Sequence, residues 1–401
     1  MLELIDRLIG GRTLDAAGPS EAAPEVKRSA LAPLIALSGG GQAVWTGRDY
    51  AGLAREGFQK NPIVYRCVRM VSEAASSVPW LIYEGEEELE DHPILDLLER
   101  PNGSEDGASF FETVFGHLQV SGNAYLEACT LDGEVRELHA LRPDRMQVVP
   151  GADGWPEGYE YRVGAERIRF DQTVEGTPPI LHLKLFHALD DHYGLSPLEA
   201  AAQSLDLHNA ASGWNKALLD NAARPSGALV YTGPEGQGLS KEQHDRLKQD
   251  LEESFQGAMN AGRPLLLEGG LDWKALSMSP KEMDFQEARN GAARDIALAF
   301  GVPPMLLGIP GDNTYANYHE ANRALWRQTV VPLINRTAKA LTRWLAPAER
   351  RLRLGFDLDA VDALSHEREA VWSRVEKASF LTEDEKRAAV GYGPKPQEEQ
   401  P

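Results

Sequence analysis

Three histidines and two aspartates lie close together in the middle of the chain and are the first candidates for chemistry. His182, His187 and His192 surround Asp190 and Asp191, and imidazole and carboxylate groups are common metal ligands. However, a spacing of five residues places successive histidines on one face of neither a helix nor a strand. The pattern therefore favours ordinary polar residues where a strand gives way to a loop, and we predict no metal site.

Ser196 is the next candidate, because Gly194-Leu195-Ser196 resembles the first half of a turn that exposes a nucleophilic serine. Leu198 stands where that turn needs its second glycine. Ser196 followed by Pro197 and Glu199 is also the pattern of a helix start, with serine as the N-cap and glutamate able to reach back to the cap amide. The sequence also lacks the Gly-Lys-Ser/Thr loop that an ATPase uses to hold phosphates. We predict no catalytic residue and no cofactor.

The composition limits the classes of protein to which the chain can belong. With 401 residues and 42% hydrophobic content, the chain is long enough for two or three domains with real cores. Its 61 acidic and 41 basic residues give a net charge of −20, which disfavours tight wrapping of nucleic acid. Only Cys67 and Cys129 are present, so we expect folding in a reducing cytoplasm. No uncharged apolar run is long enough for a transmembrane helix.

The first half of the chain predicts an α+β domain that begins at Asn61-Pro62. Val64, Cys67, Val68 and Val71 mark one face of a helix. Short β-type segments follow at close spacing, which favours a mostly antiparallel sheet. We expect further helices over 93–98 and 109–117, an acidic hairpin or loop over 84–91, and strands over 78–83, 124–129, 147–149, 159–163, 167–170 and 180–185.

The second half predicts long helices. Ser196-Pro197 begins one that should run to about Ala223, and Ser279-Pro280 begins a similar one that Pro303 and Pro304 stop. A third should run from about Tyr318 to Leu345, with Pro332 as a kink. Between the first two helices we expect a strand over 227–232, a charged helix over 240–255 and a strand pair over 264–267 and 271–276.

Six motifs occur in a fixed order between about residues 60 and 345. The motifs are Asn61-Pro62-Ile63-Val64-Tyr65-Arg66-Cys67-Val68 leading to Ser77-Val78-Pro79-Trp80; His92-Pro93-Ile94-Leu95 with Leu98-Glu99-Arg100-Pro101-Asn102; Gly122-Asn123-Ala124-Tyr125; Leu141-Arg142-Pro143; Tyr193-Gly194-Leu195-Ser196-Pro197-Leu198; and Ile296-Ala297-Leu298-Ala299-Phe300-Gly301-Val302-Pro303-Pro304. Each motif alone is weak, but the ordered set, without a competing catalytic motif, is specific. Together the motifs resemble the portal proteins of tailed bacteriophages, in the branch with the HK-type capsid fold.

The resemblance implies a multi-domain α+β portal fold that forms a ring of about twelve subunits around a channel. The channel, at one capsid vertex of a phage, prophage or gene transfer agent, would pass double-stranded DNA without sequence specificity. The implied segments are a flexible arm (1–45), a mixed α/β wing (46–190), a first stem helix (191–223), a small α/β clip (224–278), a second stem helix (279–302), a tunnel loop (303–318), a kinked wing helix (319–345) and a helical crown (346–401).

The implied partners are other copies of the chain, DNA, the major capsid protein, and the terminase large subunit followed by the head-tail adaptor, with no membrane. The ring would be assembled in the bacterial cytoplasm and end in the virion. Acidic and small polar residues along the channel would repel phosphate and let DNA slide. The candidate residues are Asp312, Asn313, Tyr315 and Asn317 at the constriction; Glu199, Asp206, Lys216 and Asp220 along the stem; and Lys241, Arg246, Lys248 and Glu252 as clip contacts.

Two other readings stay open at this point. One is an enzyme with an unrecognised pocket in the domain over 60–190, and the other is a different ring-forming head-tail connector component. Adaptors of the second kind are much shorter than this chain. A cluster of conserved acids or histidines would favour the first reading.

Overall fold

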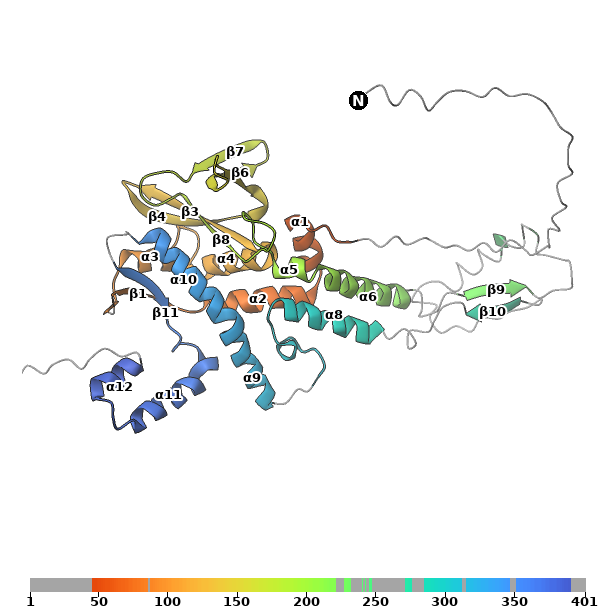
Figure 1. Cartoon of the computed structure of the whole chain (residues 1–401). Coiled ribbons are helices and arrows are strands. Elements are labelled where there is room, and N and C mark those ends of the chain that lie inside the picture. Colours follow the sequence, from red (N-terminus) through yellow and green to blue (C-terminus); the bar gives the residue numbers. More distant parts are fainter. Residues whose placement is uncertain are drawn as a thin grey trace, which may run out of the picture.

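The computed structural model describes residues 45–85, 87–220, 227–231, 240, 242, 245–246, 271–275, 285–311, 315–346 and 351–390. A body of helices and three small sheets carries two helices, α6 (Ala202–Asp220) and α8 (Phe285–Ala299), that project from one side next to each other (Figure 1). Strands β9 (Gly227–Tyr231) and β10 (Leu271–Ala275) form an antiparallel ribbon beyond their ends. Within this described part, no helix is long and apolar enough to cross a membrane.

Two helices, α2 (Pro62–Ser76) and α4 (Gly107–Ser121), pack together at the centre of the body. The side chain of Asn61 caps α2, and that of Asp106 caps α4 by accepting from the Ser109 amide. Trp80 and Phe111 lie against each other, with ring centroids 5.0 Å apart. The predicted apolar face of α2 is confirmed, since Val64, Cys67, Val68, Val71 and Ala75 are all buried, and they meet Phe110, Val114, Phe115 and Leu118 of α4 in one core.

The body holds three sheets of three strands, with orders β11-β1-β2, β4-β3-β8 and β5-β6-β7. All their strand pairs are antiparallel, as the short spacing of the β-type segments predicts. The acidic segment is a hairpin. The strands are β1 (Trp80–Glu84), β2 (Glu87–Leu89), β3 (Asn123–Leu131), β4 (Glu134–Leu141), β5 (Met146–Pro150), β6 (Pro156–Val163), β7 (Glu166–Asp171), β8 (Ile180–Lys184) and β11 (Leu352–Phe356).

The remaining helical elements complete the body and its C-terminal part. A π-helical turn, η5 (Trp326–Val330), interrupts the third long helix directly before Pro332, because proline has no amide to donate and its ring crowds the preceding turn. The interruption predicted at Pro332 is therefore present. The helices are α1 (Tyr50–Leu53), η1 (Ala54–Gln59), α3 (Pro93–Glu99), η2 (Pro143–Arg145), α5 (Pro197–Ala200), η4 (Pro304–Leu307), α9 (Tyr315–Leu325), α10 (Val331–Leu345), η6 (Asp362–Leu364), α11 (Ser365–Lys377) and α12 (Glu383–Ala389).

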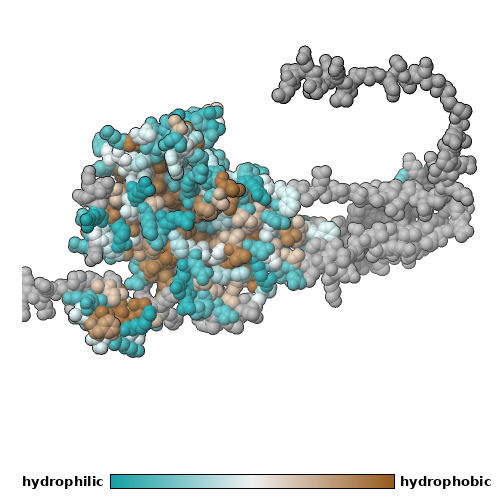
Figure 2. Space-filling view, in the orientation of Figure 1, coloured by the Kyte–Doolittle hydropathy of each residue, from teal (hydrophilic) through white to brown (hydrophobic). Residues whose placement is uncertain are grey.

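The segment predicted as a helical crown (346–401) is not helical throughout. It contains the strand β11, which pairs with β1 in the body, with Leu354 opposite Ile82. Leu352 and Leu354 are buried and Arg353 between them is exposed, which is the period of a strand with one buried face. Beyond β11, hydrophobic patches gather over α11 and α12 (Figure 2), where Trp372 is 42% and Phe380 84% exposed.

Three other expectations need correction. The strand predicted over 227–232 pairs with the one predicted over 271–276, as β9 with β10, a pairing that we did not predict, whereas the predicted partner over 264–267 lies outside the described residues. Strand β4 was missed because it alternates charged and short apolar residues and is largely exposed. The first stem helix is broken at Ala201, which separates α5 from α6.

The backbones of two predicted motifs cross where the body meets the projecting helices. Gly122 ends α4 with φ of +74°, a conformation that favours glycine. A Cβ at Gly194 would lie 2.2 Å from the Gly122 oxygen and 2.7 Å from the Leu185 nitrogen. The two glycines therefore allow the start of β3 and the chain after β8 to approach more closely than side chains permit.

Asn123 fastens this crossing with its side chain. Its Oδ1 accepts hydrogen bonds from the Gly194 amide at 2.7 Å and from His182 Nε2 at 3.0 Å. Its Nδ2 donates to the Ser121 carbonyl at 2.9 Å and the Gly194 carbonyl at 3.2 Å. Because Asn123 is buried, each of these bonds satisfies a polar group that has little access to water.

A methyl group at the crossing should destabilise the protein. In Gly194→Ala the new Cβ meets backbone atoms of two elements, and we expect the free energy of unfolding to fall by about 2 to 4 kcal/mol. Gly103→Ala is the matched control, since nothing lies within 4 Å of a Cβ there, and it should stay within about 0.5 kcal/mol of the parent. Urea denaturation followed by circular dichroism measures both, and equal stabilities would contradict the crossing.

Two enclosed histidines should make stability fall in acid. Burial lowers the pKa of His117 to about 4, and burial together with Lys184 lowers that of His182 to about 3, whereas a histidine in the unfolded chain titrates near 6.5. Between these values the unfolded chain binds more protons than the folded chain. The free energy of unfolding therefore decreases as the pH falls below about 6.5, by up to about 1.4 kcal/mol per pH unit for each histidine.

Denaturation at pH 7, 5.5 and 4.5 tests this dependence. In His182→Gln, the amide can still donate to Asn123 but cannot titrate, so the decrease between pH 7 and 4.5 should be smaller than in the parent. His117→Gln combined with His182→Gln should flatten it further. An unchanged slope in both variants would show that neither histidine is held neutral.

Candidate functional site

The two projecting helices are the candidate site, and α6 is anchored to the body at its base. The Thr46 amide donates to Asp206 Oδ2 at 3.1 Å, and the Thr46 hydroxyl donates to the other carboxylate oxygen of Asp206. Asn209 Nδ2 donates to the Glu56 carbonyl at 2.9 Å. Polar side chains of α6 thus fix the segment over 46–59 against the first two turns of the helix.

Asn61 connects the same end of α6 to the core helix α2. Its Oδ1 accepts from the Ile63 and Val64 amides as the cap of α2, which fixes the orientation of the amide group. Its Nδ2 therefore points at α6, where it donates to His208 Nδ1 and Asn209 Oδ1, both at 2.9 Å. Since Nδ1 is an acceptor here, His208 is neutral, and burial together with Arg289 lowers its pKa.

The four predicted stem residues do not share one surface in the structure. Asp206 is engaged by Thr46, and Glu199 lies on α5 at a pocket in the body. Lys216 is exposed on α6, and Asp220 is the last residue of that helix. Of these four residues, Lys216 and Asp220 therefore lie toward the far end of α6, and their assignment to a channel stays a prediction.

The predicted tunnel loop is shorter than we expected. Gly301 ends the α8 segment with φ of +65° and accepts a hydrogen bond from Thr329 Oγ1 at 2.8 Å. Further along, an Arg294 guanidinium nitrogen donates to the Pro310 carbonyl at 2.5 Å and so holds the loop to α8. The helix α9 begins at Tyr315 and not near residue 318, since no glycine or proline after Gly311 delays it.

Two of the four predicted constriction residues consequently lie in a helix. Tyr315 and Asn317 lie in the first turn of α9, and Asn317 is exposed. Asp312 and Asn313 lie outside the described residues. Of the predicted clip contacts, Arg246 is described and exposed, whereas Lys241, Lys248 and Glu252 lie outside the described residues.

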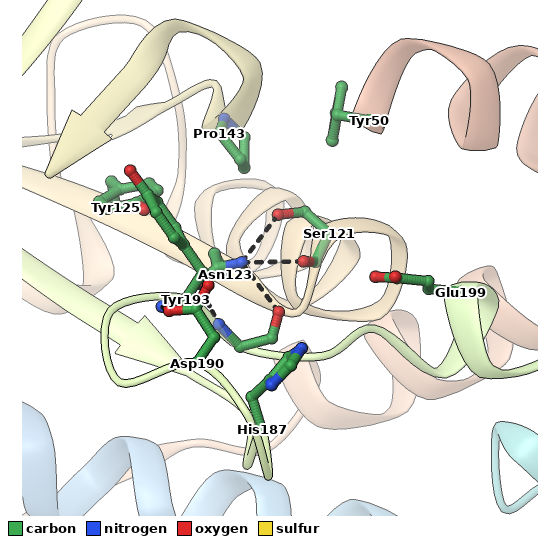
Figure 3. Close-up of a pocket in the computed structure, with 10 residues that line it drawn as sticks. Tyr50, Ser121, Asn123, Tyr125, Pro143, His187, Asp190, Tyr193 and Glu199 are labelled. Atoms are coloured by element: carbon green, nitrogen blue, oxygen red, sulfur yellow. Dashed lines mark hydrogen bonds between the residues drawn. The ribbon is translucent and has the colours of Figure 1, made fainter. Parts of the chain in front are cut away.

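A pocket of about 310 Å³ lies at the junction of body and stem, and it is where an enzyme would be sought (Figure 3). Its lining includes Asn123, His187, Asp190, Tyr193 and Glu199. Asp190 Oδ1 accepts from the amides of His192 at 2.8 Å and Tyr193 at 2.9 Å, and these bonds lower the pKa of the carboxyl group. His187 Nδ1 accepts from the Leu189 amide at 3.0 Å.

The Asp190 carboxylate and His187 Nδ1 thus hydrogen-bond to backbone amides of the loop between β8 and α5 and hold its conformation. Ser196 accepts from the Glu199 amide at 2.9 Å, which is the predicted helix cap. His182 binds Asn123, so the three histidines do not form one ligand set. In the described parts of the chain, no group of three or more histidine, cysteine, aspartate or glutamate side chains is placed to hold a metal ion.

The anchors of α6 are the functional residues that sequence reasoning missed. The Asn61-Pro62 pattern identifies a helix cap, but it carries no information on what the free side of the amide contacts. Thr46 and His208 gave no signal at all, since neither belongs to a motif with a known mechanism. These contacts join residues about 150 positions apart, which local patterns do not encode.

Comparisons with known proteins agree with this arrangement. A family model described as phage portal protein matches residues 62–391. The portal protein of Enterobacteria phage HK97 is 26% identical over 310 residues, which cover 74% of this chain and 70% of that protein.

Two solved structures are more similar. A chain in the neck of an empty gene transfer agent particle, computed with C6 symmetry, is 55% identical with a TM-score of 0.70, covering 88% of this chain and 96% of that chain. A chain in the neck of the native particle, computed with C12 symmetry, is 54% identical with a TM-score of 0.68, covering 89% of this chain and 97% of that chain. The resemblance carried by the six motifs is confirmed: the chain belongs to the phage portal protein family, whose members are structural and non-enzymatic components of the virion head.

Proposed function

We propose that the chain forms a ring of twelve subunits at one vertex of a capsid, and that double-stranded DNA enters and leaves through its centre. The observation that carries this proposal is the 54% identity, over 89% of the chain, to a neck chain whose structure was computed with C12 symmetry. The projecting pair α6 and α8 supports it, because helices that stand away from a compact body can line a channel when copies are arranged side by side (Figure 1).

The charges along the two projecting helices indicate how DNA would pass through the proposed channel. The proposed lining has no cluster of cations, since α6 carries two acidic residues and one lysine and α8 carries two acidic and two basic residues. DNA would therefore pass without the counterion release that makes basic surfaces bind tightly. The 19 residues of α6 measure about 28 Å, close to one turn of duplex DNA. We assign Lys216 and Asp220 to this lining, and Asp312, Asn313, Tyr315 and Asn317 to the constriction.

We place the partners by the geometry of the chain. The ribbon of β9 and β10 lies at the far end of the stem (Figure 1), so this clip is where the terminase large subunit and later the head-tail adaptor would dock. Lys241, Arg246, Lys248 and Glu252 are the contacts proposed there. The wing would meet the major capsid protein, after assembly in the bacterial cytoplasm and incorporation into the virion of a phage, prophage or gene transfer agent.

The ring is tested by mass photometry and negative-stain imaging of the purified full chain at near-physiological salt. Twelve chains of 44.0 kDa give a particle of about 530 kDa, and images should show a central hole wide enough for a duplex. A chain that stays monomeric at every concentration, both alone and with the capsid protein present, would contradict the proposed function.

Reversing one charge at the constriction tests the sliding mechanism. Asp312→Lys adds a cation to every subunit where the duplex is narrowly enclosed, so we expect the yield of DNA-filled particles to fall about tenfold through phosphate binding. Glu175→Lys is the matched control, because it makes the same charge change at an exposed position of the body, and its yield should equal that of the parent. Equal yields for both variants would show that repulsion at this loop is not required.

A further inference from the structure

The helix α10 carries a basic face in a chain that is otherwise acidic. Between residues 321 and 346 the sequence has five lysines and arginines and no aspartate or glutamate, although the whole chain carries a charge of −20. Leu333, Ile334, Ala338 and Leu341 face the core and are buried. The cations therefore lie on the opposite side of the helix, on the surface of the wing.

Three of these cations form one stripe. Arg336, Lys339 and Arg343 are exposed and stand at positions i, i+3 and i+7, which share one face of a helix over about 10 Å. Within the described part of the chain, none of the three takes part in an ion pair. A stripe of like charges without a counter-ion repels itself, so it indicates a surface that meets negative charge from another molecule.

The complementary surface lies on the hairpin of β1 and β2. Residues 70–99 hold nine acidic side chains and no lysine or arginine. Glu87, Glu88, Glu90 and Asp91 are exposed, and in the described residues none of them forms an ion pair with a lysine or arginine. Because β2 is the edge strand of its sheet, this acidic edge faces outward. Residues 87–91 extend about 13 Å, which matches the length of the basic stripe.

We infer that the basic stripe of α10 (Arg336, Lys339 and Arg343) in one copy binds the acidic hairpin (Glu87, Glu88, Glu90 and Asp91) of the neighbouring copy in the ring. The inference rests on the proposed ring. Two different patches of one chain that bind each other head to tail generate a closed ring when the rotation between copies closes. Copies that each carry a charge of −20 repel one another, so a contact of opposite charges is needed to set their register.

The test uses the full chain and two triple variants, each imaged and weighed at near-physiological salt. One variant is Arg336→Glu with Lys339→Glu and Arg343→Glu, and the other is Glu87→Lys with Glu88→Lys and Glu90→Lys. A preparation of either variant by itself places like charges at every contact between copies, so we expect neither variant to form rings. Arg48→Glu with Arg55→Glu and Arg374→Glu is the matched control, since these arginines are exposed on other elements, and it should form rings like the parent.

A mixture of the two triple variants gives the decisive result. In an alternating ring, contacts between the acidic α10 of one variant and the basic hairpin of the other alternate with contacts between the unchanged basic α10 and the unchanged acidic hairpin. Every contact then joins opposite charges, so two preparations that form no ring separately should form alternating rings together. Combining all six substitutions in one chain should also restore the ring. Raising the salt concentration should weaken the parent ring and the alternating ring to the same degree.

The remaining outcomes separate this inference from the proposed function. Rings in the parent and in both triple variants would overturn the interface and leave the proposed ring standing. Loss of rings without rescue in the mixture would likewise overturn the pairing of these two surfaces. Rings in the α10 variant accompanied by loss of DNA binding would assign the stripe to phosphate, against the inference. A parent chain that never forms rings would remove the proposed function and this inference together.

Discussion

The close passage of two backbones at Gly122 and Gly194 is the constraint on which the rest of the structure depends. Three elements meet there: the end of α4, the start of β3, and the chain that leaves β8 for α5. Two glycines make the distance possible, and the side-chain amide of Asn123 fixes it by bonding to Gly194 on one side and to the Ser121 carbonyl on the other. A different angle between these segments would move α5 and the start of α6 out of the core, where Leu198 and Leu205 are buried.

A second group of polar contacts, centred on Asn61, connects the projecting helix α6 to the body. Buried hydrogen bonds are costly to leave unmade, so a network whose members are all satisfied holds one geometry much more strictly than apolar packing alone. Asn61 is 1% exposed and satisfies α2 with its oxygen and α6 with its nitrogen. Through Asn61, α6 is hydrogen-bonded directly to α2, the central helix of the core.

The sequence predicted the elements that local chemistry specifies and missed those that depend on distant contacts. Asn61-Pro62 and Ser196-Pro197 mark helix starts because capping and a preset φ act within four residues. The pairing of β11 with β1 joins positions about 270 residues apart, and α+β sheets draw strands from anywhere in the chain. For the same reason the bond between Thr46 and Asp206, which are 160 positions apart, was not predicted, and the assignment of Asp206 to the channel stays a prediction.

The local distribution of charge matters more than the net charge of the chain for both proposed surfaces, which are the channel lining and the contact between neighbouring copies. In the proposed ring, a channel that does not hold DNA has few cations along its lining, while copies that stand side by side need opposite charges in contact. At physiological ionic strength an exposed charge is screened within about 8 Å. In the proposed ring, the contribution of the cations on α10 therefore depends on the charges that lie directly against them and not on the net charge of −20. A chain that is acidic overall can for this reason still present a basic surface to a neighbouring copy.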